Sequence, residues 1–168
     1  DHKILKEIFN FGKTPIGNDL LIKKNLKKKI NEYPLSVNQC MQCGHHQLSV
    51  SVDNKILYAK NYTYLTGISH VFRKYLKDYS IYISKKINLK KNDMVFEIGS
   101  NDGSLLENFK KINQCKVLGV DPSNKPSNIA KKKNINVIRD FFSFKLAKKI
   151  KKKYQNPKII TTHNTFAH

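Results

Sequence analysis

The chain has 168 residues, enough for one domain of ordinary size or for a small module joined to part of a second domain. Lysine and arginine total 32 against 12 aspartate and glutamate residues, a formal charge of +20 that indicates an anionic partner. No apolar run approaches the roughly 20 residues of a membrane span and no secretory signal pattern is visible, so we expect no membrane insertion and a cytoplasmic location.

The positive charge is almost entirely lysine and is spread along the whole chain. Lysine occurs here with many asparagines and isoleucines, a mixture that AT-rich codons produce whatever the function. Arginine, which reads guanine and clamps phosphate with two parallel bonds, occurs only at Arg73 and Arg139. The composition therefore favours an anionic small substrate at least as much as nucleic acid.

Residues 1–55 are expected to form a small, irregular module. Gly12, Pro15, Gly17 and Pro34 interrupt the segment, and only short apolar runs such as residues 4–5 and 8–9 remain as candidate strands. A core built from such runs would be thin. A bound metal would explain how the segment folds.

Cys40, Cys43 and Gly44 have the pattern of half a zinc knuckle. The two-residue spacing lets both thiolates face one ion, and the glycine permits the turn whose N–H groups bond to sulfur. A structural site needs four ligands, and the remaining ones are either among His2, His45 and His46 or, as we prefer, a second cysteine pair ahead of the first residue. Reduced, metal-binding cysteines also agree with a cytoplasmic location. Cys115 is expected to be a small buried residue.

Residues 56–90 are expected to form a linker and a helix. Apolar residues recur there at helical spacing, and Ser69 is placed to cap the first turn. We interpret the stripe as a packed helix face rather than a ligand site. Its members are Ile68, Phe72, Leu76, Tyr79 and Ile83, widened by Val71, Tyr75 and Tyr82.

Residues 91–168 alternate strand and helix, which predicts an α/β domain with a parallel sheet. Short apolar strands are expected at 94–98, 116–121, 135–138 and 159–162, with helices starting at Ser104 and covering residues 126–133 and 143–153. The sheet ends after its fourth strand, so we expect an incomplete domain and a chain truncated at both ends.

A predicted strand is followed by a glycine turn and then by the first turn of a predicted helix, and this transition spans Glu97 to Gly103. Backbone N–H groups at such a turn face a ligand at the carboxyl end of the strand. The pattern lacks the glycine pair of a dinucleotide site, and Glu97 would repel a pyrophosphate but suit a cofactor with a cationic amino group and a sulfonium. Asp121, at the tip of the next strand, is placed to accept both ribose hydroxyls. An ordinary tight turn is the alternative.

Further candidates follow the third and fourth strands. Asp140 is placed to accept an adenine amino group while Phe141 flanks the ring, although both could serve packing and a helix cap. Asn164 and His168 either face the reacting methyl group or are plain turn residues. The full set of predicted cofactor-binding residues is Glu97, Gly99, Ser100, Asn101, Asp102, Gly103, Asp121, Pro122, Asp140, Phe141 and Asn164.

In this order the motifs resemble the sugar C-methyltransferases of deoxysugar biosynthesis, which join an N-terminal zinc-binding domain to a Rossmann-like class I methyltransferase domain. The resemblance covers nearly the whole chain. The matching segments are 11–18 (FGKTPIGN), 33–35 (YPL), 40–48 (CMQCGHHQL), 62–64 (YTY), 97–103 (EIGSNDG), 118–122 (LGVDP), 140–142 (DFF) and 164–168 (NTFAH).

The resemblance implies methyl transfer from S-adenosylmethionine to a carbon beside the ketone of a nucleotide-linked keto sugar, with one structural zinc. It also implies that Tyr62 or Tyr64 takes part in catalysis and that other acid/base residues lie beyond the chain's end. His168 is a further catalytic candidate because it follows the fourth strand. Packing of a linker onto the sheet is the alternative for both tyrosines.

Two other functions remain open. A nucleic-acid methyltransferase would use the zinc knuckle and the lysines to grip phosphates, and its binding would fall steeply with salt. A non-catalytic module that binds zinc and cofactor would instead serve as a scaffold.

Overall fold

A computed structural model describes residues 4–17, 20, 23, 26, 27, 29–60 and 62–166 of the chain. The chain divides into two compact units, Asp1–Asn61 and Tyr62–His168, and each is described by itself. His168, one of the predicted catalytic residues, lies outside the described residues.

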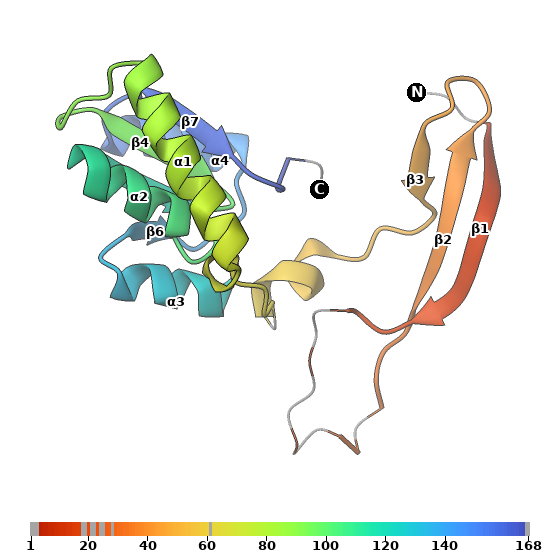
Figure 1. Ribbon diagram of the computed structural model, residues 1–168. Coiled ribbons are helices and arrows are strands. Elements are labelled where there is room, and N and C mark those ends of the chain that lie inside the picture. The colour runs from red at the N-terminus through yellow and green to blue at the C-terminus, as the bar shows by residue number, and fades with distance from the viewer. Residues whose placement is uncertain are drawn as a thin grey trace. The chain divides into compact units, whose positions relative to one another are not determined.

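The first unit is a three-stranded antiparallel sheet rather than an irregular segment (Figure 1). Its strands are β1 (Leu5–Thr14), β2 (Tyr33–Cys40) and β3 (His46–Leu48), in the order β1-β2-β3. The candidate strands at residues 4–5 and 8–9 fall at the start of and within β1, but the length of this strand was not predicted, because β1 is exposed along nearly its whole length. A strand shows alternating apolar and polar residues in its sequence when alternate side chains are buried. In β1 the backbone hydrogen bonds to β2 form without such burial.

The core of this first unit is thin, as expected. Ser36 and Cys40 are buried, whereas the apolar side chains of Phe9 and Phe11 are exposed and pack on each other with ring centroids 4.4 Å apart. A short π-helix, η2 (Lys55–Lys60), follows the sheet.

The second unit begins with a 3-10 turn, η3 (Thr66–Ile68), and helix α1 (His70–Lys86). Ser69 caps α1 as predicted, because its Oγ accepts a hydrogen bond from the Phe72 backbone N–H at 3.2 Å. The predicted apolar stripe is confirmed along its central line: Leu76 is buried, and three further members pack against the core, namely Phe72, Tyr79 and Ile83.

The wider part of that stripe is exposed. Val71, Tyr75 and Tyr82 face solvent, and Ile68 belongs to η3 rather than to the helix and is also exposed. One helix resting on one layer buries only a narrow stripe, and the sequence pattern does not show how wide that stripe is.

Four parallel strands form the sheet of the second unit, in the order β6-β5-β4-β7. Helices alternate with them as predicted. The elements are β4 (Met94–Ile98), α2 (Ser104–Asn113), β5 (Lys116–Val120), α3 (Asn124–Lys132), β6 (Asn136–Ile138), α4 (Phe144–Lys153) and β7 (Ile159–Thr162).

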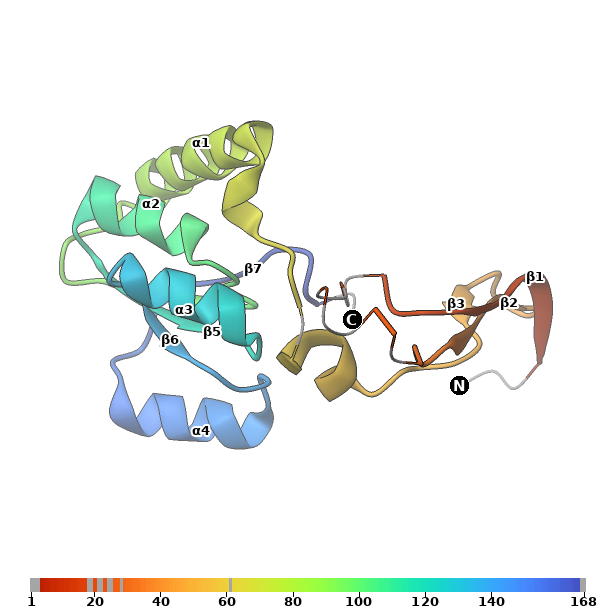
Figure 2. The ribbon, with the colours of Figure 1, turned by 90° about the horizontal axis from the view of Figure 1, so that it is seen from below.

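Helices cover both faces of this sheet, with α1, α2 and α3 on one side and α4 on the other (Figure 2). Strand β4 is buried along its whole length, and its side chains alternate between the layers. Val95 packs with Leu106 and Phe109 toward α1 and α2, whereas Phe96 packs with Ile150 on the α4 side. Burial on both faces explains the continuous apolar runs that predicted a parallel sheet.

Cys115 is a buried residue of this core, as expected. Its Sγ donates to the Phe109 carbonyl at 3.5 Å, and burial raises the pKa of the thiol. Among the described residues, no helix combines the length and the apolar character needed to cross a membrane.

Candidate functional site

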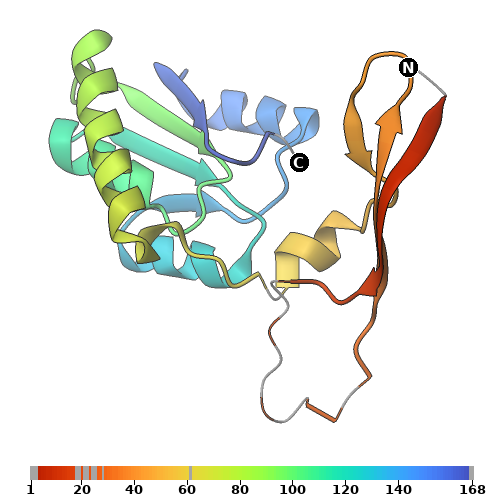
Figure 3. The same ribbon diagram turned by 45° about the vertical axis from the view of Figure 1, so that its right-hand side comes forward.

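The turn between β4 and α2 lies at the carboxyl edge of the parallel sheet, where the strand arrowheads point in Figure 3. Gly99 and Gly103 have φ angles of +74° and +72°, a left-handed conformation that favours glycine. A Cβ on Gly99 would clash with the side chain of Thr165, and one on Gly103 would lie 3.0 Å from the Cβ of Ala130. Both glycines are therefore required by conformation and by close packing.

Three carboxyl groups are buried around this turn. Glu97 is 4% exposed, Asp102 4% and Asp121 5%. Buried carboxyl groups are stable only when they are hydrogen-bonded, paired with a cation or protonated. The three residues meet this requirement in different ways.

Backbone hydrogen bonds compensate the buried charge of the Asp121 carboxylate. Its Oδ2 accepts from the Asn101 N–H and its Oδ1 from the Ser123 N–H, both at 2.8 Å. The carboxylate thus joins the glycine turn after β4 to the loop after β5. Each oxygen keeps a further lone pair, so acceptance of ribose hydroxyls stays a prediction.

Asn101 and Asp102 use their side chains to hold the segment that precedes α1. Asn101 Oδ1 accepts from the Thr66 N–H at 2.9 Å, and Asp102 Oδ2 accepts from the Gly67 N–H at the same distance. A Cβ on Gly67 would lie 2.6 Å from Asp102 Oδ2, so only glycine at this position lets the backbone approach the Asp102 carboxylate this closely. A role for either side chain in cofactor binding stays a prediction.

This contact brings the predicted catalytic tyrosines to the glycine turn. Asn101 Nδ2 donates to the Tyr64 carbonyl at 3.1 Å, and the rings of Tyr62 and Tyr64 lie 6.3 Å apart. Tyr64 is 48% exposed. The two residues thus lie beside the turn although 37 positions separate Tyr64 from Asn101.

Glu97 has a different environment, with His163 as its neighbour. His163 Nδ1 lies 3.9 Å from Glu97 Oε1, and the imidazole packs edge-on against Tyr79 with ring centroids 5.0 Å apart. Sequence reasoning missed His163, although it is the first residue after β7 and the carboxyl ends of adjacent parallel strands meet at one edge.

The remaining predicted residues lie around the same edge. Ser100 is buried, and Pro122 is partly buried beside Asp121. Asp140 is exposed and its Oδ1 accepts from the Phe141 N–H at 2.8 Å. Asn164 is exposed at the turn after β7, with a φ of +50°.

The predicted zinc half-site is a tight turn between β2 and β3. The Gly44 N–H donates to the Cys40 carbonyl at 2.9 Å, and Gly44 has a φ of +73°. Backbone N–H groups of Cys43 and Gln42 lower the pKa of the Cys40 thiol, which favours the thiolate that binds metal. The described residues contain no group of three or more possible metal ligands, so two thiolates are what this part of the chain offers.

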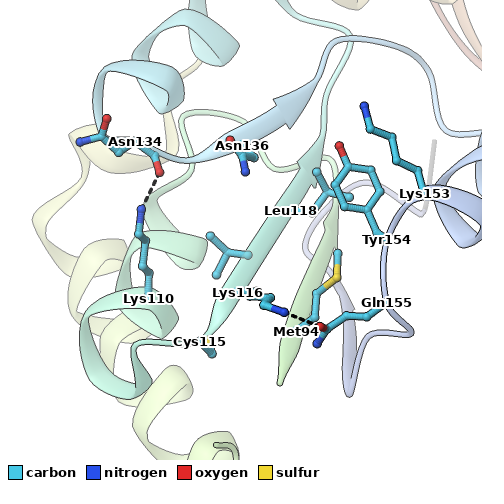
Figure 4. A pocket seen from close by; sticks show the side chains of 11 residues that line it. Met94, Lys110, Cys115, Lys116, Leu118, Asn134, Asn136, Lys153, Tyr154 and Gln155 are labelled. Atoms are coloured by element: carbon cyan, nitrogen blue, oxygen red, sulfur yellow. Dashed lines mark hydrogen bonds between the residues drawn. The ribbon is translucent and has the colours of Figure 1, made fainter. Parts of the chain in front are cut away.

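A separate cavity of about 510 Å³ lies at the opposite, amino edge of the sheet (Figure 4). Met94, Leu118 and Tyr154 form part of its lining, together with the lysines Lys110 and Lys116. The described residues that line it include no carboxylate and several lysines, so its charge is unfavourable for a cationic ligand. The acidic cluster at the carboxyl edge is the candidate site for one.

Comparison with known proteins finds a family model similar to the first unit and a relative similar to nearly the whole chain. Residues 1–58 match a family model described as "Putative zinc binding domain". The chain is also similar to the C-methyltransferase NovU of Streptomyces niveus, with 24% identity over 162 residues, which is 96% of this chain and 38% of the relative. The two matches confirm the resemblance to C-methyltransferases with a zinc-binding N-terminus.

Two solved methyltransferase structures are similar to part of the chain. The plantazolicin methyltransferase BpumL in complex with SAH has 22% identity and a TM-score of 0.40 over 54% of this chain and 34% of that one. The magnesium protoporphyrin IX methyltransferase of Synechocystis PCC 6803 with bound SAM has 18% identity and a TM-score of 0.37 over 41% and 36%. Both similarities cover only part of the chain. The fold is therefore defined here by the strand order and register of the sheet and not by these matches.

Proposed function

We propose that the full chain is an S-adenosylmethionine-dependent methyltransferase that acts on a carbon of a nucleotide-linked keto-deoxysugar in the cytoplasm. The observation that carries this proposal is the cluster of buried carboxyl groups around the glycine turn at the carboxyl edge of a parallel sheet. Similarity to a C-methyltransferase over 96% of the chain supports it.

Glu97, Asp121 and the backbone of the glycine turn would hold the cofactor, whose chemistry is to supply an electrophilic methyl group. Glu97 faces its cationic part, and the free lone pairs of Asp121 accept hydrogen bonds. Asp140 and Phe141 lie after β6, where the adenine would be bound.

Tyr62 and Tyr64 are our candidates for proton transfer to or from the sugar, because Asn101 holds their segment at the turn. His168 is the further candidate for proton transfer after β7, and Asn164, in the same part of the sequence, is a candidate cofactor-binding residue. This assignment would place the acceptor carbon on the side of the turn that the tyrosine segment covers.

The full chain is expected to bind S-adenosylmethionine and not NAD. A pyrophosphate would add negative charge beside three buried carboxyl groups, whereas a sulfonium and an ammonium compensate them. Isothermal titration calorimetry with both ligands tests this. Preferential binding of NAD would contradict the proposal, and turnover of nucleotide-linked keto sugars in a methyl-transfer assay would then decide the substrate class.

The full-length protein is expected to carry about one structural zinc per chain, held in part by Cys40 and Cys43. Cys43→Ser should remove most of the metal, because a tetrahedral site rarely survives on three ligands of this kind. Elemental analysis measures the content, with Cys115→Ser as the matched control that keeps it. Less than about half an equivalent in the unaltered protein would contradict the assignment.

The net charge of +20 is the observation that favours a nucleic-acid substrate instead. That function predicts an affinity for nucleic acid which falls steeply between low and physiological salt. The keto-sugar proposal predicts no such binding at physiological salt, and fluorescence anisotropy with labelled oligonucleotides distinguishes the two.

A further inference from the structure

Glu97 differs from the other two acids of the site in having almost no compensation. It projects from the centre of the sheet, and the structure shows no hydrogen-bond partner for its Oε2 among the described atoms. Asp121 and Asp102, by contrast, each accept backbone N–H bonds. A negative charge on Glu97 would therefore be both buried and unpaired.

The groups that face Glu97 do not supply a positive charge. Burial raises the pKa of Glu97 well above its usual value, and the negative charges of Asp121 on the β5 side and Asp102 in the turn raise it further. Lys133 lies 3.8 Å from Asp102 and 3.6 Å from Glu107, and the ion pairs of the described residues do not connect it to Glu97.

His163, on the β7 side, is the one described basic group near Glu97, and its surroundings disfavour the charged form of its ring. Its edge packs against Tyr79 and Tyr75 of α1, and burial lowers its pKa. Thr161 Oγ1 lies 3.4 Å from its Nδ1. A neutral imidazole 3.9 Å from Glu97 Oε1 does not offset a carboxylate charge.

We propose that Glu97 is a neutral carboxylic acid while the site is empty, and that it gives up this proton when a ligand with a positive charge enters beside it. The O–H bond of Glu97 breaks, the proton passes to solvent, and the ligand's charge takes its place. The net charge of the site is then the same before and after binding. This inference rests on the proposed function, which supplies a cationic ligand.

The proposal sets the direction of two pH effects. Ligand affinity rises with pH until Glu97 is ionised in the empty site, because less work is then needed to remove its proton. Stability changes in the opposite sense. A carboxyl group whose folded pKa is raised contributes stability that is complete below its unfolded pKa and is lost as pH rises through the folded value.

Calorimetry on the full chain tests the proton transfer. Titration with S-adenosylmethionine at one pH, in phosphate and in Tris, reports protons released because the two buffers have different heats of ionisation. We expect release of about one proton per site from the unaltered protein. The uncharged analogue 5′-methylthioadenosine should release none. Equal heats in both buffers, or equal proton release with the uncharged analogue, would overturn the proposal.

Two variants identify the group that releases the proton. Glu97→Gln should still bind the ligand, more weakly, with no proton release, whereas His163→Asn should keep the release. Release that persists in Glu97→Gln and disappears in His163→Asn would assign the proton to the histidine and overturn the proposal.

Thermal melting without ligand tests the protonation state apart from the proposed function. The melting temperature of Glu97→Gln relative to the unaltered protein should rise between pH 5 and pH 9, because the amide cannot ionise. A difference that stays constant over this range would overturn the neutral state of Glu97. If that difference rises but S-adenosylmethionine fails to bind, the neutral acid stands and the proposed function is contradicted.

Discussion

Asp121→Ala is expected to lower both the stability of the protein and its affinity for S-adenosylmethionine. The carboxylate accepts the Asn101 and Ser123 N–H groups, and its removal leaves two buried donors without their acceptor. Unsatisfied buried donors cost about 1–3 kcal/mol each, so we expect a loss of about 2–6 kcal/mol of unfolding free energy. Loss of the ribose acceptor should weaken binding by about tenfold to a thousandfold.

Denaturant unfolding and calorimetry on the same Asp121→Ala sample separate the two effects. Asp78→Ala is the matched control, because Asp78 is an exposed acid of α1 paired only with Lys74, and its loss should change stability by less than about 0.5 kcal/mol. A variant that unfolds earlier but binds normally would restrict Asp121 to a structural role. One that binds poorly with unchanged stability would show that its backbone bonds contribute little.

Gly99→Ala is expected to disrupt the glycine turn. Alanine at a φ of +74° costs about 1–2 kcal/mol by itself, and its Cβ would also clash with Thr165. The turn or the segment after β7 must therefore shift, which moves Glu97 and His163 relative to each other. We expect a loss of about 3 kcal/mol in stability and cofactor binding below detection.

Gly17→Ala is the control for this substitution, because a Cβ there meets no atom within 4 Å and the residue lacks a positive φ. Thr165→Ala in the Gly99→Ala background should recover part of the stability, since it removes the Thr165 side-chain atoms nearest to the new methyl group. Melting curves of the four proteins measure both effects. Stability unchanged in Gly99→Ala would contradict the packing described here.

The strands and helices of the second unit could be predicted from the sequence because burial leaves a direct pattern there. Strand β4 is buried on both faces, so its five residues form one apolar run around Glu97. Local chemistry also predicted the cap at Ser69 and the glycine turn after β4, since each depends on neighbours within a few residues. The first unit could not be predicted in this way, because β1 is exposed and carries no alternation.

By itself the sequence determined the α/β alternation, the place of the glycine turn, the acids around it and the cysteine pair. Only the tertiary structure decided which of these groups touch. It gave Asp121 two backbone donors, turned Asn101 and Asp102 toward the segment before α1, and placed His163 beside Glu97. Apart from the bond between Asp121 and Ser123, which is local, these contacts join positions 20 to 66 residues apart. The pairing of parallel strands, which no local pattern records, brings the ends of β4, β5 and β7 to one edge.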